Sequence, residues 1–508
     1  MRGHDGSGRG PAARGLVAIA ALVASVLVLS ATDSTALPGS ARHELRGMWI
    51  ASVANIDWPS RQGLPAAQQR QEYVSLLDRA KLLNINAVFV QIRPTADAFY
   101  PSKLEPWSRY LTGRQGGDPG YDPLAFLVSE AHKRDLEFHA WFNPYRVSLH
   151  DDPSELVPTH PARLHPDWLI SYGGQLYYDP GVPAARVFVE RVILDTTRRY
   201  DIDGVHFDDY FYPYPVAGEQ FPDERTYQTY GASRFPDKGD WRRDNVNQLI
   251  SDLSQRIHQV KPWVAFGVSP FGVWRDRRTD PTGSDTTAGV HDYDDLYADT
   301  RTWIRHRWVD YIAPQLYWPI GFTVADYAKL LPWWVNEVAG SGVALYIGQA
   351  ASRIGSSSPA GWDNPREMPN HIALDRSTPG IGGDIFFNAT ALLDNRLGFA
   401  DRLRTDLYQW PALVPARATL PGHPPPRPAP IGAQEPTAQG PTLRWIGFPT
   451  TASYGVYRDD RLIATIRADG PLASFTDRAA DQGRHTYAVT ASDREHHESP
   501  PSGIEGSR

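Results

Sequence analysis

The sequence predicts an α/β protein, in which a (β/α)8 TIM-type barrel over residues 44–408 precedes a small all-β sandwich over residues 438–504. Eight short apolar segments alternate with segments of helical periodicity between residues 44 and 408, as in a succession of parallel βα units. These segments are apolar throughout, as strands covered on both sides are. The last 70 or so residues carry only short β-rich runs between turns. A doubly wound open sheet is the alternative, disfavoured because no Gly-x-Gly-x-x-Gly follows the first strand.

The predicted elements follow one another regularly. The strands are 44–51, 85–92, 136–142, 202–208, 263–269, 309–317, 343–349 and 380–387. The helices are 66–83, 122–134, 183–200, 240–260, 293–306, 324–338 and 391–407. The longest connections all follow strands, at 93–121, 143–182, 209–239 and 270–292. Because the loops after the strands form the active face of such a barrel, we expect the functional residues there.

The ends of the barrel are marked by changes of composition. Three arginines precede an apolar run at 16–29, and small residues follow at 34–36. This is typical of a secretory signal peptide, so residues 1–36 are assigned to one, with an uncleaved anchor as the alternative. We therefore expect a secreted or extracytoplasmic protein without a stable membrane span after cleavage. Residues 411–436 are rich in proline and are predicted to be a stiff linker.

The composition excludes several classes of protein. With no cysteine, the chain has no disulfide, thiolate metal site or cysteine nucleophile. The formal charge of −7 and the absence of a basic patch argue against nucleic acid as a partner. Sixteen tryptophans and 24 tyrosines exceed what a core needs and favour a cleft lined by flat rings. We expect a monomer without metal or cofactor.

The end of the fourth strand, "DGVHFDD", carries paired acids. Strand alternation places His206 and Asp208 on one face and Val205 and Phe207 on the other. If the apolar pair packs against the helices, Asp208 reaches the top of the barrel, where barrel enzymes keep their catalytic groups. Asp209 begins the loop and is expected to support Asp208. The simpler alternative is that both aspartates only cap the loop.

Polar side chains mixed with aromatic rings end the predicted strands two to six. The candidate substrate contacts are Arg93, His139, Asn143, Tyr145, His206, Tyr210, Trp274, Gln315, Tyr317 and Trp318. Together they would stack on flat apolar faces and hydrogen-bond hydroxyls, which is the combination that a carbohydrate presents. In the sandwich, Trp445, Tyr454 and Tyr457 either form an exposed glycan-binding stripe or belong to the core of a spacer module.

Several stretches carry a resemblance to a known family. The stretches "ELRGMWIASVANIDWP", "VQIRPTADAFYPSKLEPWS", "DGVHFDDYFYPYP", "GVSPFGVWRD" and "DYIAPQLYWP" resemble the glycosyl hydrolase-like 10 family over residues 44–408. The resemblance implies a barrel with glycosidase-type activity at the cell envelope, including cleavage of peptidoglycan glycan strands that have lost their stem peptides. Its motif positions match at Asp97, His139, Asn143, Asp208, Asp209, Tyr210, Trp274, Gln315, Tyr317 and Trp318. Residues 438–504 resemble a fibronectin type III module.

Glycoside hydrolysis requires two carboxyl groups, one as proton donor and one as nucleophile or base. "DGVHFD" also resembles the strand-four motif of amylase-type barrels, which implies that Asp208 is the nucleophile or base. The acid stays open among Asp97, which is the favoured candidate, Asp209 and Asp223. Two other functions stay open as well. A metal-dependent polysaccharide deacetylase would use His139, His206 and Asp208 as metal ligands, and a glycan-binding barrel would have no catalytic activity.

Overall fold

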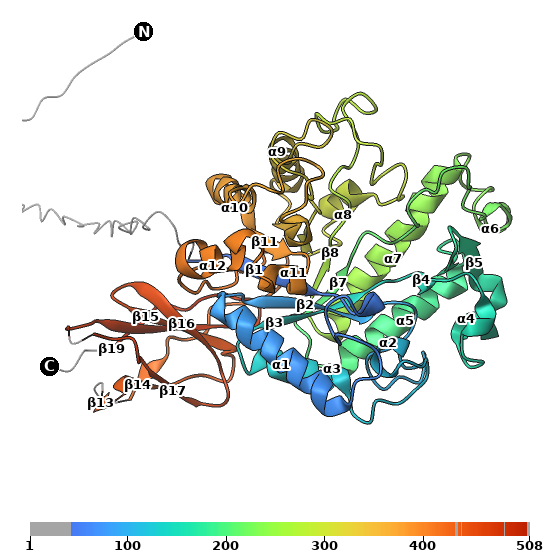
Figure 1. The fold of residues 1–508 in the computed structure, drawn as a ribbon. Coiled ribbons are helices and arrows are strands. Elements are labelled where there is room, and N and C mark those ends of the chain that lie inside the picture. Colours follow the sequence, from blue (N-terminus) through green and yellow to red (C-terminus); the bar gives the residue numbers. More distant parts are fainter. Residues whose placement is uncertain (1–41, 432–434, 438, 482, 505–508) are drawn as a thin grey trace, which may run out of the picture. The chain divides into compact units, whose positions relative to one another are not determined.

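The computed structural model describes residues 42–431, 435–437, 439–481 and 483–504 (Figure 1). The predicted signal peptide, residues 1–36, lies outside them. Within these described ranges, no helix combines the length and the apolar character needed to cross a bilayer.

Eight parallel strands close into a barrel in the order β1-β11-β10-β9-β8-β7-β3-β2. Their bounds are β1 Leu45–Ile50, β2 Ala87–Arg93, β3 Glu137–Phe142, β7 Gly204–Phe207, β8 Ala265–Val268, β9 Tyr311–Ile312, β10 Ala344–Gln349 and β11 Ile381–Phe386. The predicted (β/α)8 fold is thereby confirmed, with one strand in each predicted segment and only β2 extending one residue beyond its segment. β9 is much shorter than predicted, because Pro314 has no N–H group with which to continue a ladder.

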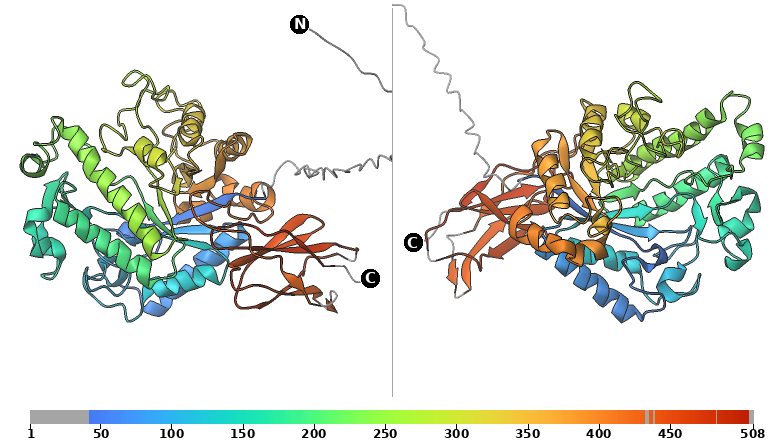
Figure 2. Two further views of the ribbon diagram at one scale, coloured as in Figure 1. Left: turned by 180° about the vertical axis from the view of Figure 1, so that it is seen from behind. Right: turned by 45° about the horizontal axis from the view of Figure 1, so that its top comes forward.

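Helices cover the outside of the barrel (Figures 1 and 2). The longer ones are α1 Ala66–Leu82, α3 Pro123–His132, α5 Pro183–Arg199, α7 Lys238–Val260, α8 Thr300–His306, α9 Tyr327–Val338 and α10 Glu367–Ser377. α8 begins seven residues later than predicted, because the Asp299 side chain caps it there by accepting the Thr302 N–H at 3.3 Å. α10 was not predicted. The predicted last helix is divided into shorter pieces, including α11 Ala389–Leu393 and α12 Phe399–Arg402.

A small antiparallel sheet occupies the connection after β3, which was predicted to be a loop. It consists of β4 Arg146–Ser148, β5 Leu169–Tyr172 and β6 Gln175–Tyr178 in the order β4-β6-β5. Gly173 and Gly174 join β5 to β6, and both have positive φ, as a two-residue hairpin turn requires. The sheet matters for function because its first residue, Arg146, follows shortly after β3 and hydrogen-bonds to Asn143.

The C-terminal residues form a small all-β domain of two antiparallel sheets. Its strands are β12 Ala429–Pro430, β13 Glu435–Thr437, β14 Gly440–Ile446, β15 Ser453–Arg458, β16 Arg461–Arg467, β17 Leu472–Thr476, β18 Tyr487–Ser492 and β19 Ser502–Ile504. Trp445 and Tyr454 are fully buried in its core and Tyr457 is buried in a second apolar cluster, so the three rings form no exposed stripe. The resemblance to a fibronectin type III module stays a prediction.

The predicted linker does not behave as a free spacer along its first half. Val414 and Leu420 are buried against the apolar interior of the barrel. Arg417 is 1% exposed and donates to both Glu137 carboxylate oxygens, at 3.0 and 2.7 Å. Glu137 is the first residue of β3, so this segment packs at the end of the barrel opposite the strand C-termini.

Candidate active site

Asp208 and Asp209 follow β7 at the C-terminal mouth of the barrel, and they are 7% and 4% exposed. Asn143, which follows β3, donates its amide N–H to Asp208, and the Tyr210 backbone N–H donates to the other Asp208 oxygen at 3.2 Å. Asp209 accepts from the Tyr214 hydroxyl and from Gln315 Nε2 at 3.1 Å. The two carboxyl groups thus have separate side-chain partners. Asn143, after β3, donates to Asp208, and Gln315, after β9, donates to Asp209.

The electrostatics of the two acids differ. Burial raises the pKa of Asp208 to about 7, and the neighbouring Asp209 charge acts in the same direction. Burial also raises the pKa of Asp209, but the hydrogen bonds from Tyr214 and Gln315 oppose that rise. Two adjacent buried carboxyl groups titrate together. Burial and the Asp209 charge thus favour the protonated form of Asp208, whereas the two donors to Asp209 favour its carboxylate.

The orientation of the Asn143 amide is fixed by its neighbours. Its oxygen accepts from Gln91 Nε2 at 2.5 Å and from Arg146 Nη2 at 2.8 Å. Because both groups are donors, the amide nitrogen must face Asp208. The Arg146 guanidinium also lies over the Tyr210 ring, 5.0 Å from its centroid, and its charge lowers the pKa of both aspartates.

Half-buried aromatic rings surround the carboxyl groups. The Tyr210 and Tyr214 centroids are 5.7 Å apart, and the series continues through Phe271 (6.1 Å from Tyr214) to Trp318 (5.4 Å from Phe271). Tyr317 stacks on Phe387 at 6.2 Å. These rings keep partly exposed faces beside two carboxyl groups, an arrangement suited to stacking on a sugar.

Three other predicted substrate contacts have different surroundings. Arg93 is fully buried in an ion pair with Glu105 and donates to the Asn143 carbonyl oxygen at 2.5 Å, so it supports the site from behind. Trp274 packs on Trp333, with centroids 5.9 Å apart. Tyr145 is fully buried, and its carbonyl oxygen accepts the Tyr178 N–H at 2.8 Å.

Both predicted histidines lie inside the barrel in a chain of hydrogen bonds. Trp49 donates its indole N–H to His206 Nε2 at 3.0 Å, and Tyr311 bridges His206 Nδ1 and His139 Nδ1 at 3.0 and 2.9 Å. His139 Nε2 lies 3.2 Å from a Glu137 carboxylate oxygen. Because the Trp49 indole can only donate, His206 Nε2 accepts, and His206 carries its proton on Nδ1. The Tyr311 hydroxyl accepts that N–H and donates to His139 Nδ1, so His139 carries its proton on Nε2. Burial lowers the pKa of both rings, so both are neutral core groups with all four nitrogens engaged.

The other two candidate acids have neighbours of their own. Asp97 is fully buried beside Thr95 and Ser108 of its own loop, and burial raises its pKa to about 7. Asp223 forms a bidentate ion pair with Arg242 at 2.6 and 2.7 Å. Asp209, by contrast, shares one electrostatic environment with Asp208, so the geometry favours Asp209 as its partner.

Sequence reasoning missed one acid near the pair. Asp292, in the connection after β8, is fully buried, and its pKa is raised well above the usual range by burial and by the Asp209 charge. Its backbone N–H donates to the Val273 carbonyl at 2.9 Å, which holds the loop in place. The one available signal was its position at the end of a long loop after a strand.

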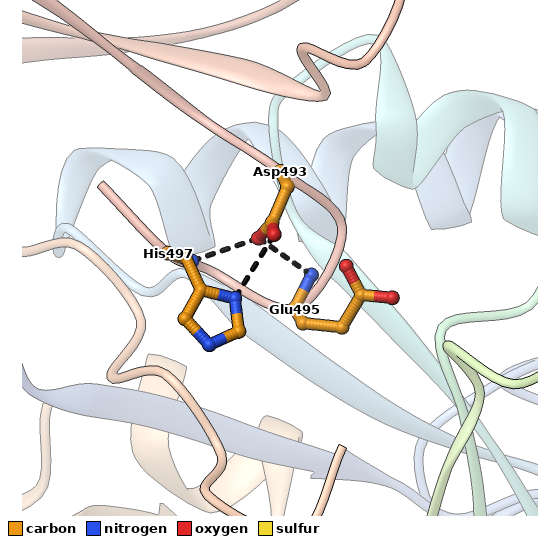
Figure 3. Close-up of side chains that lie close together, drawn as sticks. All are labelled: Asp493, Glu495 and His497. Carbon is orange, nitrogen blue, oxygen red and sulfur yellow. Dashed lines mark hydrogen bonds and ion pairs between the residues drawn. The ribbon is translucent and has the colours of Figure 1, made fainter. Parts of the chain in front are cut away.

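Among the described residues, one group has the spacing of metal ligands: Asp493, Glu495 and His497 in the all-β domain, with ligand atoms within 4.8 Å of one another (Figure 3). The Asp493 carboxylate is already engaged. It accepts the backbone N–H groups of Glu495 and His497 at 3.1 and 2.8 Å and lies 2.9 Å from His497 Nδ1. This arrangement stabilises a turn, as aspartates commonly do, and gives no specific support for an ion.

Comparison with known proteins gives consistent matches. The sequence model of the family described as Glycosyl hydrolase-like 10 matches residues 44–363. "Glycosyl hydrolase YngK" of Bacillus subtilis (strain 168) is 51% identical over 472 residues, covering 90% of this chain and 92% of that protein. "Glycosyl hydrolase DigH" of Escherichia coli (strain K12) is 42% identical over 364 residues, covering 68% and 82%. Among solved structures, the PgaB (BpsB) glycoside hydrolase domain from Bordetella bronchiseptica has a TM-score of 0.43 at 16% identity, covering 70% of this chain and 99% of that one.

Proposed function

This chain belongs to the glycosyl hydrolase-like 10 family, and from that premise we propose that it is a glycoside hydrolase acting outside the cytoplasm on a cell-envelope polysaccharide. The observation that carries the proposal is the pair Asp208 and Asp209, buried together at the mouth of the barrel within a rim of half-buried rings. The proposed substrate is a peptidoglycan glycan strand, a choice supported by the family resemblance of the strand-end motifs. The protein is proposed to act as a secreted monomer.

In the proposed mechanism Asp208 is the proton donor and Asp209 the carboxylate. The glycosidic C–O bond breaks as Asp208 protonates the leaving oxygen, and Asp209 either attacks the anomeric carbon or takes a proton from the attacking water. This reverses the role that the amylase-type motif implied for Asp208. The reason is physical: burial and the adjacent charge raise the pKa of Asp208 to about 7, so it holds its proton at pH values below 7, whereas Asp209 has two donors that favour its ionised form.

The deacetylase alternative has less support. It would need His139 and His206 as metal ligands, but the ring nitrogens of both are engaged inside the barrel. A glycan-binding barrel without activity has the same rim of rings, so only a test of catalysis separates it from the proposal.

The proposal is tested by mass spectrometry of the products from peptide-free peptidoglycan strands incubated in 18O-labelled water. A hydrolase shortens the strands and places one 18O atom at each new reducing end. Strands that are bound but stay intact would indicate a lectin. Acetate release that stops with EDTA and returns with zinc would indicate a deacetylase.

The raised pKa values of the two aspartates predict the pH dependence and the role of Arg146. Activity should fall as the pH rises through about 7, because Asp208 must be protonated, and should fall at lower pH as Asp209 loses its charge. Arg146→Met removes a cation that favours both ionised forms, so both limbs of the pH–rate profile should move up by about one unit. Arg146→Lys keeps the charge and should shift the profile much less. An unchanged profile in Arg146→Met would contradict the assignment.

Tyr214→Phe tests the donor to Asp209. The variant keeps the ring of the rim but removes the hydroxyl, so the Asp209 carboxylate should lose a charge-assisted hydrogen bond and its pKa should rise. We expect kcat to fall by about tenfold, with the acid limb of the profile moving to higher pH. Tyr210→Phe is the matched control and should retain kcat within about twofold. Equal effects of the two variants would argue against a specific role for Tyr214.

A further inference from the structure

A groove of about 940 Å³ lies on the flank of the barrel, apart from the residues of the candidate active site. The loop after β2, the approach to α3 and the outer face of α5 form its walls. The side chains that matter most are Lys103, Trp107, Tyr121, Arg191, Arg198 and Arg199. We call this surface the flank groove.

The flank groove is cationic although the whole chain carries a net charge of −7. Its two acids are already engaged: Asp195 pairs with Arg199 at 2.8 Å, and Asp118 accepts the Gly120 N–H at 2.7 Å. Lys103, Arg191 and Arg198 are exposed and form no ion pair with any residue that the structure describes. Cations gathered in a hollow attract anions, and arginine binds carboxylates in a bidentate manner.

The groove also offers flat apolar faces on a fixed backbone. Trp107 is half-buried, and its carbonyl oxygen accepts the Gly116 N–H at 2.8 Å. The flanking backbone is paired as well, since the Ser108 N–H donates to the Ala98 carbonyl oxygen at 3.0 Å. Tyr121 is held by a bond from its hydroxyl to Gln69 at 2.8 Å. The backbone at Trp107 and the Tyr121 side chain are therefore set in place before any ligand binds.

We propose that the flank groove is an accessory binding site for a carboxylated glycan, whose sugar rings stack on Trp107 while its carboxylates pair with Arg191, Arg198 and Lys103. The choice of a glycan rests on the proposed function. The positive charge of the groove indicates that this glycan is acidic. The loop that forms the groove wall also contains Glu105, which pairs with Arg93. Arg93 donates to the Asn143 carbonyl oxygen, and the Asn143 side chain donates to Asp208 at the catalytic mouth. A long acidic chain bound in the groove is thus held on the same rigid support as the two carboxyl groups.

The test measures binding by calorimetry in an Asp208→Asn background, so that cleavage does not interfere. The probes are oligogalacturonate and a neutral cello-oligosaccharide of the same length. The acidic probe should bind more tightly, and the double variant Arg191→Ser/Arg198→Ser should weaken its binding by about tenfold. Trp107→Ala should weaken it further. Arg225→Ser/Arg277→Ser, which removes two exposed arginines outside the groove, is the matched control and should bind as the parent does.

Unchanged binding of oligogalacturonate in the double arginine variant would overturn the proposal. Tighter binding of poly(glycerol phosphate), insensitive to Trp107→Ala, would also overturn it and indicate a surface for phosphate polymers. In the Asp208-containing protein, the groove substitutions should leave hydrolysis of a short neutral substrate unchanged. If the glycan binds in a groove-dependent manner but the protein cleaves no glycan, the proposed hydrolase function is wrong and the proposed binding site stands. The failure of the function can therefore be told apart from the failure of the binding site.

Discussion

Asp208→Asn is expected to lower kcat on a natural glycan by about 10³-fold while leaving the fold and glycan binding intact, because proton transfer by a positioned side chain supplies about 10²–10⁴-fold. The amide has nearly the shape of the carboxyl group, and its oxygen can still accept the Tyr210 N–H. It cannot deliver a proton to the leaving oxygen. Product formation and glycan binding should be measured on the same preparation, with circular dichroism as the check on folding.

The leaving group distinguishes the two possible roles of Asp208. A dinitrophenyl glycoside needs no protonation to depart, so Asp208→Asn should cleave it nearly as fast as the parent if Asp208 is the acid. If Asp208 is the nucleophile, both substrates should lose activity equally, and our assignment would be reversed. Asp209→Asn should impair both substrates. Asp97→Asn serves as a control for burial, because Asp97 lies among residues of its own loop, and it should change the free energy of unfolding more than kcat.

The fold and the position of Asp208 were predictable because both follow from local periodicity. A strand alternates its side chains, so Val205 and Phe207 pack outward against the helices and His206 points inward. Alternation does not tell how high along the barrel axis an inward side chain lies. His139 and His206 were therefore assigned to substrate, although they hydrogen-bond within the barrel interior.

The site contacts that could not be predicted depend on segments that are distant in the sequence. Arg242 lies in α7 and pairs with Asp223 of the preceding connection. Arg146 reaches Asn143 from a short sheet that has no regular pattern in the sequence. Asp292 lies near Asp209 because of a long loop whose path depends on backbone bonds such as that to Val273. Residue types and spacing identify candidates for such sites, but the partners of each candidate come from tertiary structure.

Arg93→Met is expected to lower the free energy of unfolding by about 3–5 kcal/mol, because it leaves the Glu105 carboxylate buried without its partner. Both side chains are fully buried, and Arg93 donates to the two Glu105 oxygens at 2.8 and 2.5 Å. The double variant Arg93→Met/Glu105→Gln removes both charges and should recover much of the loss. Urea unfolding, monitored by tryptophan fluorescence, measures the difference.

The same substitution connects stability to catalysis. Arg93 also holds the carbonyl oxygens of Asn143 and Pro144, at 2.5 and 3.0 Å, so the strand end that presents the Asn143 amide to Asp208 depends on it. Under conditions where the variant is folded, the pKa of Asp208 should therefore rise, because the carboxylate loses a donor, and the alkaline limb of the pH–rate profile should move upward. A variant that is less stable but keeps the parent profile would show that Arg93 supports the loop without orienting Asn143. A shifted profile would make Arg93 a positioning residue that acts on Asp208 through a backbone carbonyl, in place of the direct substrate contact that its sequence position suggested.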